Sequence, residues 1–322
     1  NIFCVITSRY LVPFLIIHRY LAVLPANIDE TKRIRIFNIT LNHFDHDIDE
    51  CWELLRNYIE KAQSIWEEKR NTKQPIYVAD WVNMYKKLEM QHPNSIRVVW
   101  SRSGNLYAGV LNPDRETIFG FPLNRIMLRW VLGNRIVRED IFPSDGRTLP
   151  VICDNMLHYI NVESESEAYW LSGLLNSKKI RQLVARRAGG GRGPLDIYNL
   201  PAQILNEFIP DGFDESDPTH IKIAETARKL EEKVGKMIRE YILQVKGKRD
   251  EIRVLDDTID PEKVIPNIPS NIVFNYLEGR FPRGRTAGLN KLKQFINREE
   301  IKQAITTYRT LNELVDSITI RR

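Results

Sequence analysis

The stretch SESEAYWLSGLLNSKKIRQLVARRAGGGRGP, residues 164–194, decides how the fold of this chain is interpreted. Ser164 and Glu167 form an S-x-x-E capping box, which predicts that a helix begins here and continues through EAYWLSGLL. Asn176 and Ser177 predict a break in that helix and the cap of a second one, KKIRQLVARR. Three consecutive glycines between arginines follow the second helix directly.

The end of this stretch carries dense positive charge without an acidic residue. Six cations lie within fifteen residues: Lys178, Lys179, Arg181, Arg186, Arg187 and Arg192. Flexible backbone beside clustered guanidinium groups suits close approach to a nucleic-acid backbone. The glycines, Gly190 among them, lack the spacing of a P-loop or of a dinucleotide fingerprint. The alternative is a solvated basic helix end, which the helix macrodipole also favours.

The sequence before this stretch alternates between strand and helix patterns. Two short buried strands with a proline break are predicted over 10–26, and a further strand over 34–41. Apolar residues at three-to-four spacing predict an amphipathic helix over 49–70. Two β-rich runs around Ser-Gly-Asn predict a hairpin over 97–111, and one or two strands follow over 149–162.

A long helix dominates the C-terminal part of the prediction. Asp217 and Pro218 suit its N-cap and first helical position, and it extends to about Gly247. Its apolar face packs either on this domain or on a partner. The face consists of Ile221, Ala224, Ala227, Leu230, Val234, Met237, Ile238, Tyr241 and Val245.

These patterns predict an α+β fold with a mixed sheet, a long helix and a small helical C-terminal tail. The expected segments are strands and an amphipathic helix over 1–75, a mixed α/β region over 76–215, the long helix over 216–250 and a basic helical tail over 251–322.

The composition limits the classes of protein and their compartment. The chain has 322 residues, is 43% hydrophobic and carries a net charge of +5, which permits a nucleic-acid partner without requiring one. Cys4, Cys51 and Cys153 are too widely spaced for a disulfide framework or a zinc site, so we expect free thiols in the cytoplasm. The apolar N-terminal stretch is interrupted by charges and proline, so we expect no membrane helix. Its abrupt start favours a fragment of a longer polypeptide.

No catalytic pattern is visible in the sequence. The polar segment NHFDHDIDE, residues 42–50, more often precedes a helix than binds a metal, so we predict no metal site. LNPDRE, residues 111–116, lacks the second proline and the aromatic residue of the motif with which amino-methyltransferases hold the target base. No glycine-rich loop for S-adenosylmethionine is present either. We therefore predict no catalytic residue in this chain.

Several segments, in this order, resemble the C-terminal half of large prokaryotic adenine-N6 DNA methyltransferases that are fused to or associated with restriction systems. The segments are LVPFLIIHRYLAVLP (11–25), AQSIWEEKR (62–70), YVADWVNMYKKLEMQHPNSIRVVWSRSGNLYAGVL (77–111), VICDNMLHYINVESESEAYWLSGLLNS (151–177) and LNEFIPDGFDESDPTHIKIAETARKLEEKV (205–234). In that family this half follows the methylase domain and contains the target-recognition domain.

The resemblance implies a role in sequence-specific recognition of duplex DNA, with residues 76–215 as the target-recognition region. The methylase domain that binds S-adenosylmethionine would lie outside this chain, in cis or in trans, so this chain alone would hold no cofactor. DNA contacts are then expected from the cations at 178–192, from the backbone around Gly190, and from Arg102 and Ser103 in the SRSG turn. For that turn the alternative is a simple hairpin tip.

A different class of function stays open from the sequence alone. The chain could be a protein-interaction module that docks a partner through the long helix and has no role in DNA binding. A stand-alone nuclease finds no support, because no PD-(D/E)xK run is present.

Overall fold

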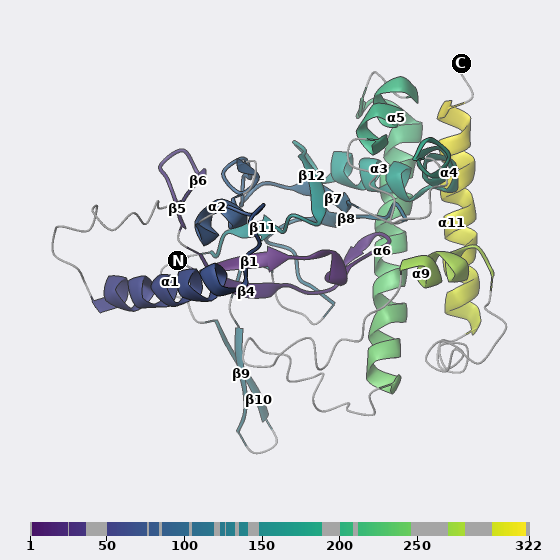
Figure 1. Cartoon of the computed structure of the whole chain (residues 1–322). Coiled ribbons are helices and arrows are strands. Elements are labelled where there is room, and N and C mark those ends of the chain that lie inside the picture. Colours follow the sequence, from purple (N-terminus) through teal and green to yellow (C-terminus); the bar gives the residue numbers. More distant parts are fainter. Residues whose placement is uncertain are drawn as a thin grey trace.

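The computed structural model describes residues 2–24, 26–36, 50–75, 77–83, 86–102, 105–118, 123–125, 127–132, 135–140, 148–188, 200–208, 212–245, 270–280 and 298–319. The long helices of the C-terminal half stand at one side of the molecule, and small sheets extend from them toward the N-terminal helix at the other side (Figure 1). The prediction of an α+β fold is therefore confirmed.

The first three-stranded sheet is mixed. Its central strand β1 (Ile2–Ile6) runs antiparallel to β4 (Tyr20–Val23) and parallel to β11 (Val151–Cys153). Cys4 and Cys153 lie on these strands, and both are buried and form no disulfide. The start of the chain thus pairs with residues 151–153, and this contact brings the two ends of the β-rich part of the sequence together.

The second three-stranded sheet is antiparallel throughout. β7 (Arg97–Ser101) lies between β8 (Ala108–Leu111) and β12 (Leu157–Asn161). The hairpin predicted over 97–111 is β7–β8 and is confirmed. The strand pattern over 149–162 corresponds to two strands, β11 and β12, which belong to different sheets.

Three short hairpins complete the described strands. Pro13 lies in the turn between the two-residue strands β2 and β3, as the predicted proline break requires, but the stretch 10–26 also contains β4, so the prediction of two strands is wrong. The β9–β10 hairpin was not predicted. The hairpin strands are β2 (Leu11–Val12), β3 (Leu15–Ile16), β5 (Ala26–Ile28), β6 (Ile34–Ile36), β9 (Met127–Leu132) and β10 (Arg135–Asp140), and the 3-10 helix η1 covers Ser8–Tyr10.

The long helix α6 (Pro218–Val245) forms the axis of the helical part and packs on α3 (Glu165–Asn176) and α11 (Arg298–Thr319). Its start is as predicted, because the side chain of Asp217 accepts a hydrogen bond from the backbone N–H of Thr219 at 2.6 Å. α3 approaches closely at Gly173, where a Cβ atom would lie 3.1 Å from Ile223 and 3.3 Å from Leu311.

The apolar face predicted for the long helix is covered within this chain. Its buried members belong to the largest hydrophobic cluster, which also contains Trp100 and Val110 of the second sheet and Leu311 of α11. This cluster therefore joins the helices to the sheet. The buried members are Ala224, Ala227, Leu230, Val234, Met237, Ile238 and Tyr241.

The C-terminal tail is part of the helical layer where the structure describes it. α9 (Ser270–Leu277) packs on α11, and α11 contacts both α6 and α4 (Lys178–Arg187). α5 (Leu200–Phe208) packs on α4.

At the opposite side, α1 (Glu50–Lys69) confirms the predicted N-terminal helix and contacts α2 (Val78–Val82). Its amphipathic face is only partly covered, since Tyr58 is 52% exposed and Ile65 46% exposed. None of the described helices combines the length and the apolar character that a membrane crossing requires.

Candidate nucleic-acid interface

The junction between α3 and α4 is held by the capping residues of the segment 164–194. The Ser164 hydroxyl accepts the backbone N–H of Glu167 at 3.1 Å, which confirms the predicted cap of α3. The Glu167 carboxylate accepts the backbone N–H of Glu163 at 2.9 Å. At the far end of α3, the Ser177 hydroxyl accepts the backbone N–H of Ile180 and caps α4, also as predicted.

Asn176 fastens this junction to the sheet. Its side-chain amide donates to the Ala108 carbonyl at 2.8 Å and accepts the Ala108 N–H at 3.0 Å. A buried amide thus satisfies both backbone groups of one residue of β8, as a neighbouring strand would. The start of α4 is therefore fixed relative to the second sheet.

α4 is held on the helical layer by its apolar and polar contacts. Ile180 and Val184 are buried. The backbone N–H of Lys178 donates to the side chain of Asn312 on α11 at 2.7 Å. α4 is therefore held in place by packed neighbours, and the side chains on its outer face project from a fixed helix.

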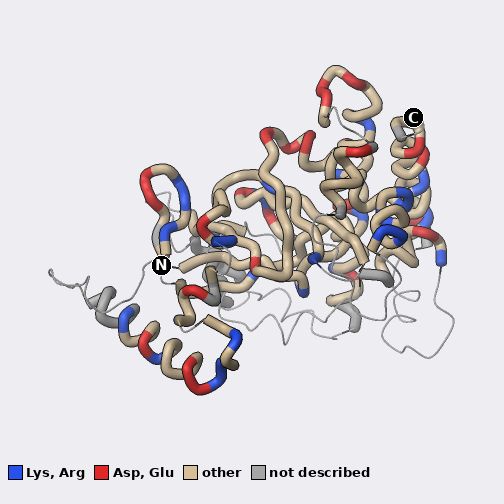
Figure 2. Tube along the Cα trace, turned by 45° about the horizontal axis from the view of Figure 1, so that its top comes forward, with Lys and Arg blue, Asp and Glu red and all other residues tan. Residues whose placement is uncertain are grey.

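The outer face of α4 carries a basic stripe, which we define as Lys178, Lys179 and Arg186. Lys178, Gln182 and Arg186 follow one another at intervals of four residues, so their side chains lie along one face of the helix. Lys178, Gln182 and Arg186 are exposed, and Lys179 is half-buried. α4 contains no acidic residue, whereas Figure 2 shows Asp and Glu positions among the Lys and Arg positions of the helices around it.

Arg181 points inward rather than toward solvent. Its guanidinium carbon lies 3.2 Å from the centroid of the Phe274 ring. Its Nη1 donates to Glu278 at 3.2 Å and to the Tyr308 hydroxyl at 3.3 Å. That hydroxyl in turn donates to the Asn176 carbonyl, and burial raises the pKa of Tyr308. Arg181 thus joins α4 to α9 and α11, and we leave it out of the candidate DNA surface.

Arg187 lies on the flank of α4 and forms an ion pair with Glu207 of α5 at 2.6 Å. Both side chains are partly exposed, at 38% and 48%. An exposed ion pair of this kind contributes little to stability, so Arg187 can leave Glu207 and bind another anion. Arg187 therefore borders the basic stripe without belonging to it.

The remaining predicted contacts are not brought together with α4 by the described residues. Arg102 follows β7, where its backbone N–H donates to the Met156 carbonyl at 3.0 Å, so it belongs to the tip of the second sheet. Ser103, Gly190 and Arg192 lie outside the described residues and stay predictions. The polar segment 42–50 lies outside them as well, apart from Glu50 at the start of α1.

Sequence reasoning missed a buried ionic cluster between the sheet and the helices. Glu231 of α6 accepts the Tyr169 hydroxyl at 2.6 Å and pairs with Arg115 at 2.6 Å. Arg115 also lies 4.0 Å from Glu165 and over the Tyr169 ring. Burial raises the pKa of Glu231 to about 7, although Arg115 opposes the shift. The segment 111–116 thus contributes an ion-pairing turn.

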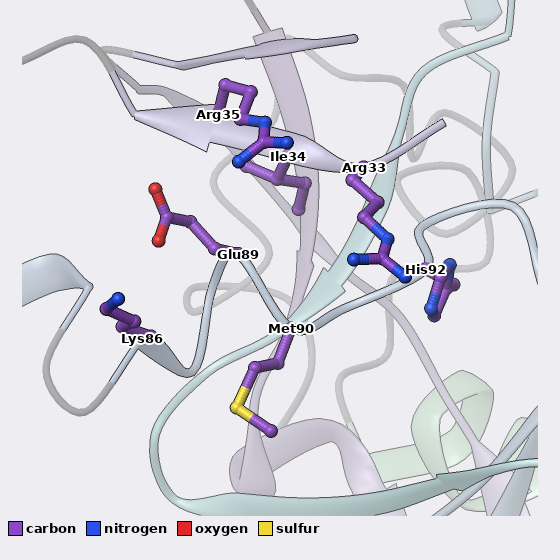
Figure 3. Close-up of a pocket in the computed structure, with 7 residues that line it drawn as sticks. All are labelled: Arg33, Ile34, Arg35, Lys86, Glu89, Met90 and His92. Carbon is purple, nitrogen blue, oxygen red and sulfur yellow. The ribbon is translucent and has the colours of Figure 1, made fainter. Parts of the chain in front are cut away.

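A cavity of about 390 Å³ was also missed. It lies between the β5–β6 hairpin and the segment 86–92, away from α4 (Figures 1 and 3). Its lining combines cations with apolar atoms: Arg33, Ile34, Arg35, Lys86, Glu89, Met90 and His92. These residues come from two separate segments of modest charge, so no motif could have indicated the cavity. Among the described residues, no group of three or more His, Cys, Asp or Glu side chains is arranged to hold a metal ion.

Comparisons with known proteins add no family to this description. No protein-family model matches the chain, and no curated protein or solved structure matches it significantly.

Proposed function

We propose that this chain recognises duplex DNA as the target-recognition part of an adenine-N6 DNA methyltransferase of a restriction-modification system. The catalytic domain would lie outside this chain. It would transfer a methyl group from S-adenosylmethionine to an adenine that is turned out of the base stack. The role of this chain is to position the duplex and to read a short sequence.

The observation that carries the proposal is the basic stripe on a firmly held helix. Lys178, Lys179 and Arg186 project from α4 with no acidic residue on that helix. Cations fixed along one face can contact successive phosphates, and the release of bound counterions then favours binding. A contact of this kind sets the register of the protein on the duplex but does not read bases.

Base reading is proposed for the residues that follow α4. The sequence continues from Arg187 into the glycine segment with Arg192, and a guanidinium can make two hydrogen bonds to guanine in the major groove. Arg102 at the sheet tip is a second proposed reader. The adenine specificity and the methylase partner rest on the family resemblance of the sequence.

The protein-docking alternative finds less support. It relied on a free apolar face of the long helix, whereas most of that face is buried against other elements of this chain. A docking partner would need a different surface.

Selection from a pool of randomised duplex DNA tests the proposal. We expect the chain to retain duplexes that share one short sequence containing adenine. Retention without an enriched sequence would contradict the reading of bases, and no retention at low salt would contradict DNA binding altogether. The variant Lys178→Gln/Lys179→Gln/Arg186→Gln is the matched control and should retain much less DNA in every selection round.

A further inference from the structure

We propose that the cavity between the β5–β6 hairpin and residues 86–92 binds an organic phosphate of the nucleoside monophosphate class. The site is separate from the basic stripe, since the hairpin and α4 lie at opposite sides of the molecule in Figure 1. It would therefore bind its ligand whether or not α4 binds DNA.

Arg33 and Lys86 supply the positive charge for the phosphate. Arg35 is already engaged, because its Nε donates to Asp29 at 2.8 Å. Within the described part of the chain, the side chains of Arg33 and Lys86 have no hydrogen bond or ion pair. Figure 3 shows Arg33, the residue before β6, with its guanidinium beside the His92 ring. The guanidinium of Arg33 and the imidazole of His92 together offer donors to phosphate oxygens, and Lys86 adds positive charge at the opposite side of the cavity (Figure 3).

The backbone holds the hairpin side of the cavity in place. The backbone N–H of Asp29 donates to the Arg33 carbonyl at 2.9 Å, and the backbone N–H of Arg33 donates to the Asp29 carboxylate at 3.0 Å. The Thr31 hydroxyl donates to the same carboxylate at 2.6 Å. The backbone that carries the Arg33 side chain is therefore held in place, so less backbone entropy is lost when Arg33 binds a ligand.

The facing segment is braced in a similar way. The Asn83 side chain accepts the backbone N–H groups of Leu88 and Glu89 at 3.2 and 3.3 Å. Lys86 itself has φ 57°, a left-handed conformation that costs energy for a residue with a side chain. The segment tolerates this conformation at the residue that brings an ammonium group to the cavity.

Apolar atoms beside the cations favour a phosphate that carries an organic group. Met90 is 65% exposed at the edge of the cavity and supplies this apolar surface, whereas Ile34 is fully buried beneath the cavity. A thioether packs well against a flat ring, so Met90 offers a surface for a base. A volume of about 390 Å³ lies within the range of small-molecule sites. The concave shape suits a terminal phosphate better than an internal phosphate of a duplex.

Glu89 makes the proposal sharply testable. Its carboxylate lies on the wall of the cavity and, among the described residues, has no cationic partner. It should repel a bound phosphate, so its removal should tighten binding, whereas removal of a cation should weaken it. If these side chains had only a structural role, their removal would not produce opposite effects on the binding of a ligand.

Isothermal titration calorimetry of the full chain with adenosine 5′-monophosphate is the test. We expect binding that weakens about tenfold in Arg33→Gln, because this variant removes a charge-assisted contact, and that weakens less in Lys86→Gln, because Lys86 acts from the opposite side of the cavity. Glu89→Gln should bind more tightly than the wild type. Adenosine should bind at least about tenfold more weakly than the monophosphate, and inorganic phosphate should compete with it. The variant Lys178→Gln/Arg186→Gln on α4 should bind the monophosphate unchanged.

Several results would overturn the site. These are no binding of the monophosphate, equal binding of adenosine, or unchanged binding in Arg33→Gln with native circular dichroism. Loss of monophosphate binding in the α4 variant would place the ligand on the basic stripe instead. Displacement of the monophosphate by duplex DNA, with weaker DNA binding in Arg33→Gln, would make the cavity a part of the DNA surface. The absence of DNA binding by the wild type would leave the cavity proposal untouched.

Discussion

Asn176 and Ala108 exchange two hydrogen bonds across 68 residues of sequence, and this exchange ties the α3–α4 junction to the second sheet. The side-chain amide of Asn176 makes the two hydrogen bonds to Ala108 of β8 that a neighbouring strand would otherwise make. The buried N–H of Ala108 depends on it, whereas the Ala108 carbonyl also accepts the backbone N–H of Phe14 at 2.7 Å.

We expect Asn176→Ala to lower the free energy of unfolding by about 1–3 kcal/mol, because it leaves the buried Ala108 N–H without a partner, while the Ala108 carbonyl still accepts the Phe14 N–H at 2.7 Å. Urea unfolding followed by circular dichroism measures the change. Gln303→Ala, an exposed substitution on α11, serves as the control and should change the free energy by less than about 0.5 kcal/mol. A loss for Asn176→Ala no larger than this control would show that Ala108 finds other partners.

Arg181→Lys should separate stability from DNA binding. Lysine keeps the charge but loses the planar stacking on Phe274 and the fork of donors to Glu278 and Tyr308. The thermal midpoint should therefore fall, while the DNA affinity of the folded protein stays the same. Arg186→Gln should do the reverse, with an unchanged midpoint and weaker DNA binding. Differential scanning fluorimetry and DNA titrations on both variants check this, and a DNA defect in folded Arg181→Lys would return Arg181 to the DNA surface.

Glu231 should make stability fall as the pH rises. Burial raises its pKa in the folded chain to about 7 from an ordinary value of 4.5. Between these values the native state binds more protons than the unfolded state, so the contribution is complete below the lower value and is lost through the upper one. Burial lowers the pKa of His18 to about 3, which acts in the opposite direction below its ordinary value of 6.5.

Comparison with Glu231→Gln isolates this one group, because His18 titrates in both proteins. The free energy of unfolding of the wild type relative to the variant should decrease between about pH 5 and pH 8. Urea unfolding at several pH values measures this difference. An increase in this free-energy difference with pH would mean that the ion pair with Arg115 lowers the pKa of Glu231 more than burial raises it. The charged carboxylate would then be the favoured form in the native state.

The parts of the fold that the sequence predicts are those set by neighbouring residues. Ser164, Ser177 and Asp217 cap the helices that they were expected to cap, since a cap acts within three residues of the chain. The β7–β8 hairpin follows from two β-rich runs and a short turn for the same reason.

The parts that it does not predict depend on partners far along the chain. Six cations at 178–192 look equivalent in sequence, yet Arg181 turns inward because Phe274, Glu278 and Tyr308 surround it. Glu231 and Arg115 are likewise brought together only by packing of α6 against the sheet side. The cavity needs two separate segments, and neither carries a recognisable motif alone.

The most direct test of the proposed function is fluorescence anisotropy of the chain with duplex DNA, titrated at several salt concentrations. For the wild type we expect the logarithm of the association constant to fall linearly with the logarithm of the salt concentration. Lys178→Gln/Lys179→Gln/Arg186→Gln should bind more weakly and reduce the slope by up to about three, because each phosphate contact contributes close to one. The equally charged control Lys222→Gln/Lys229→Gln/Lys302→Gln should keep most of the slope. Equal slopes and affinities for the wild type and the α4 variant, or no binding at low salt, would contradict DNA recognition through α4.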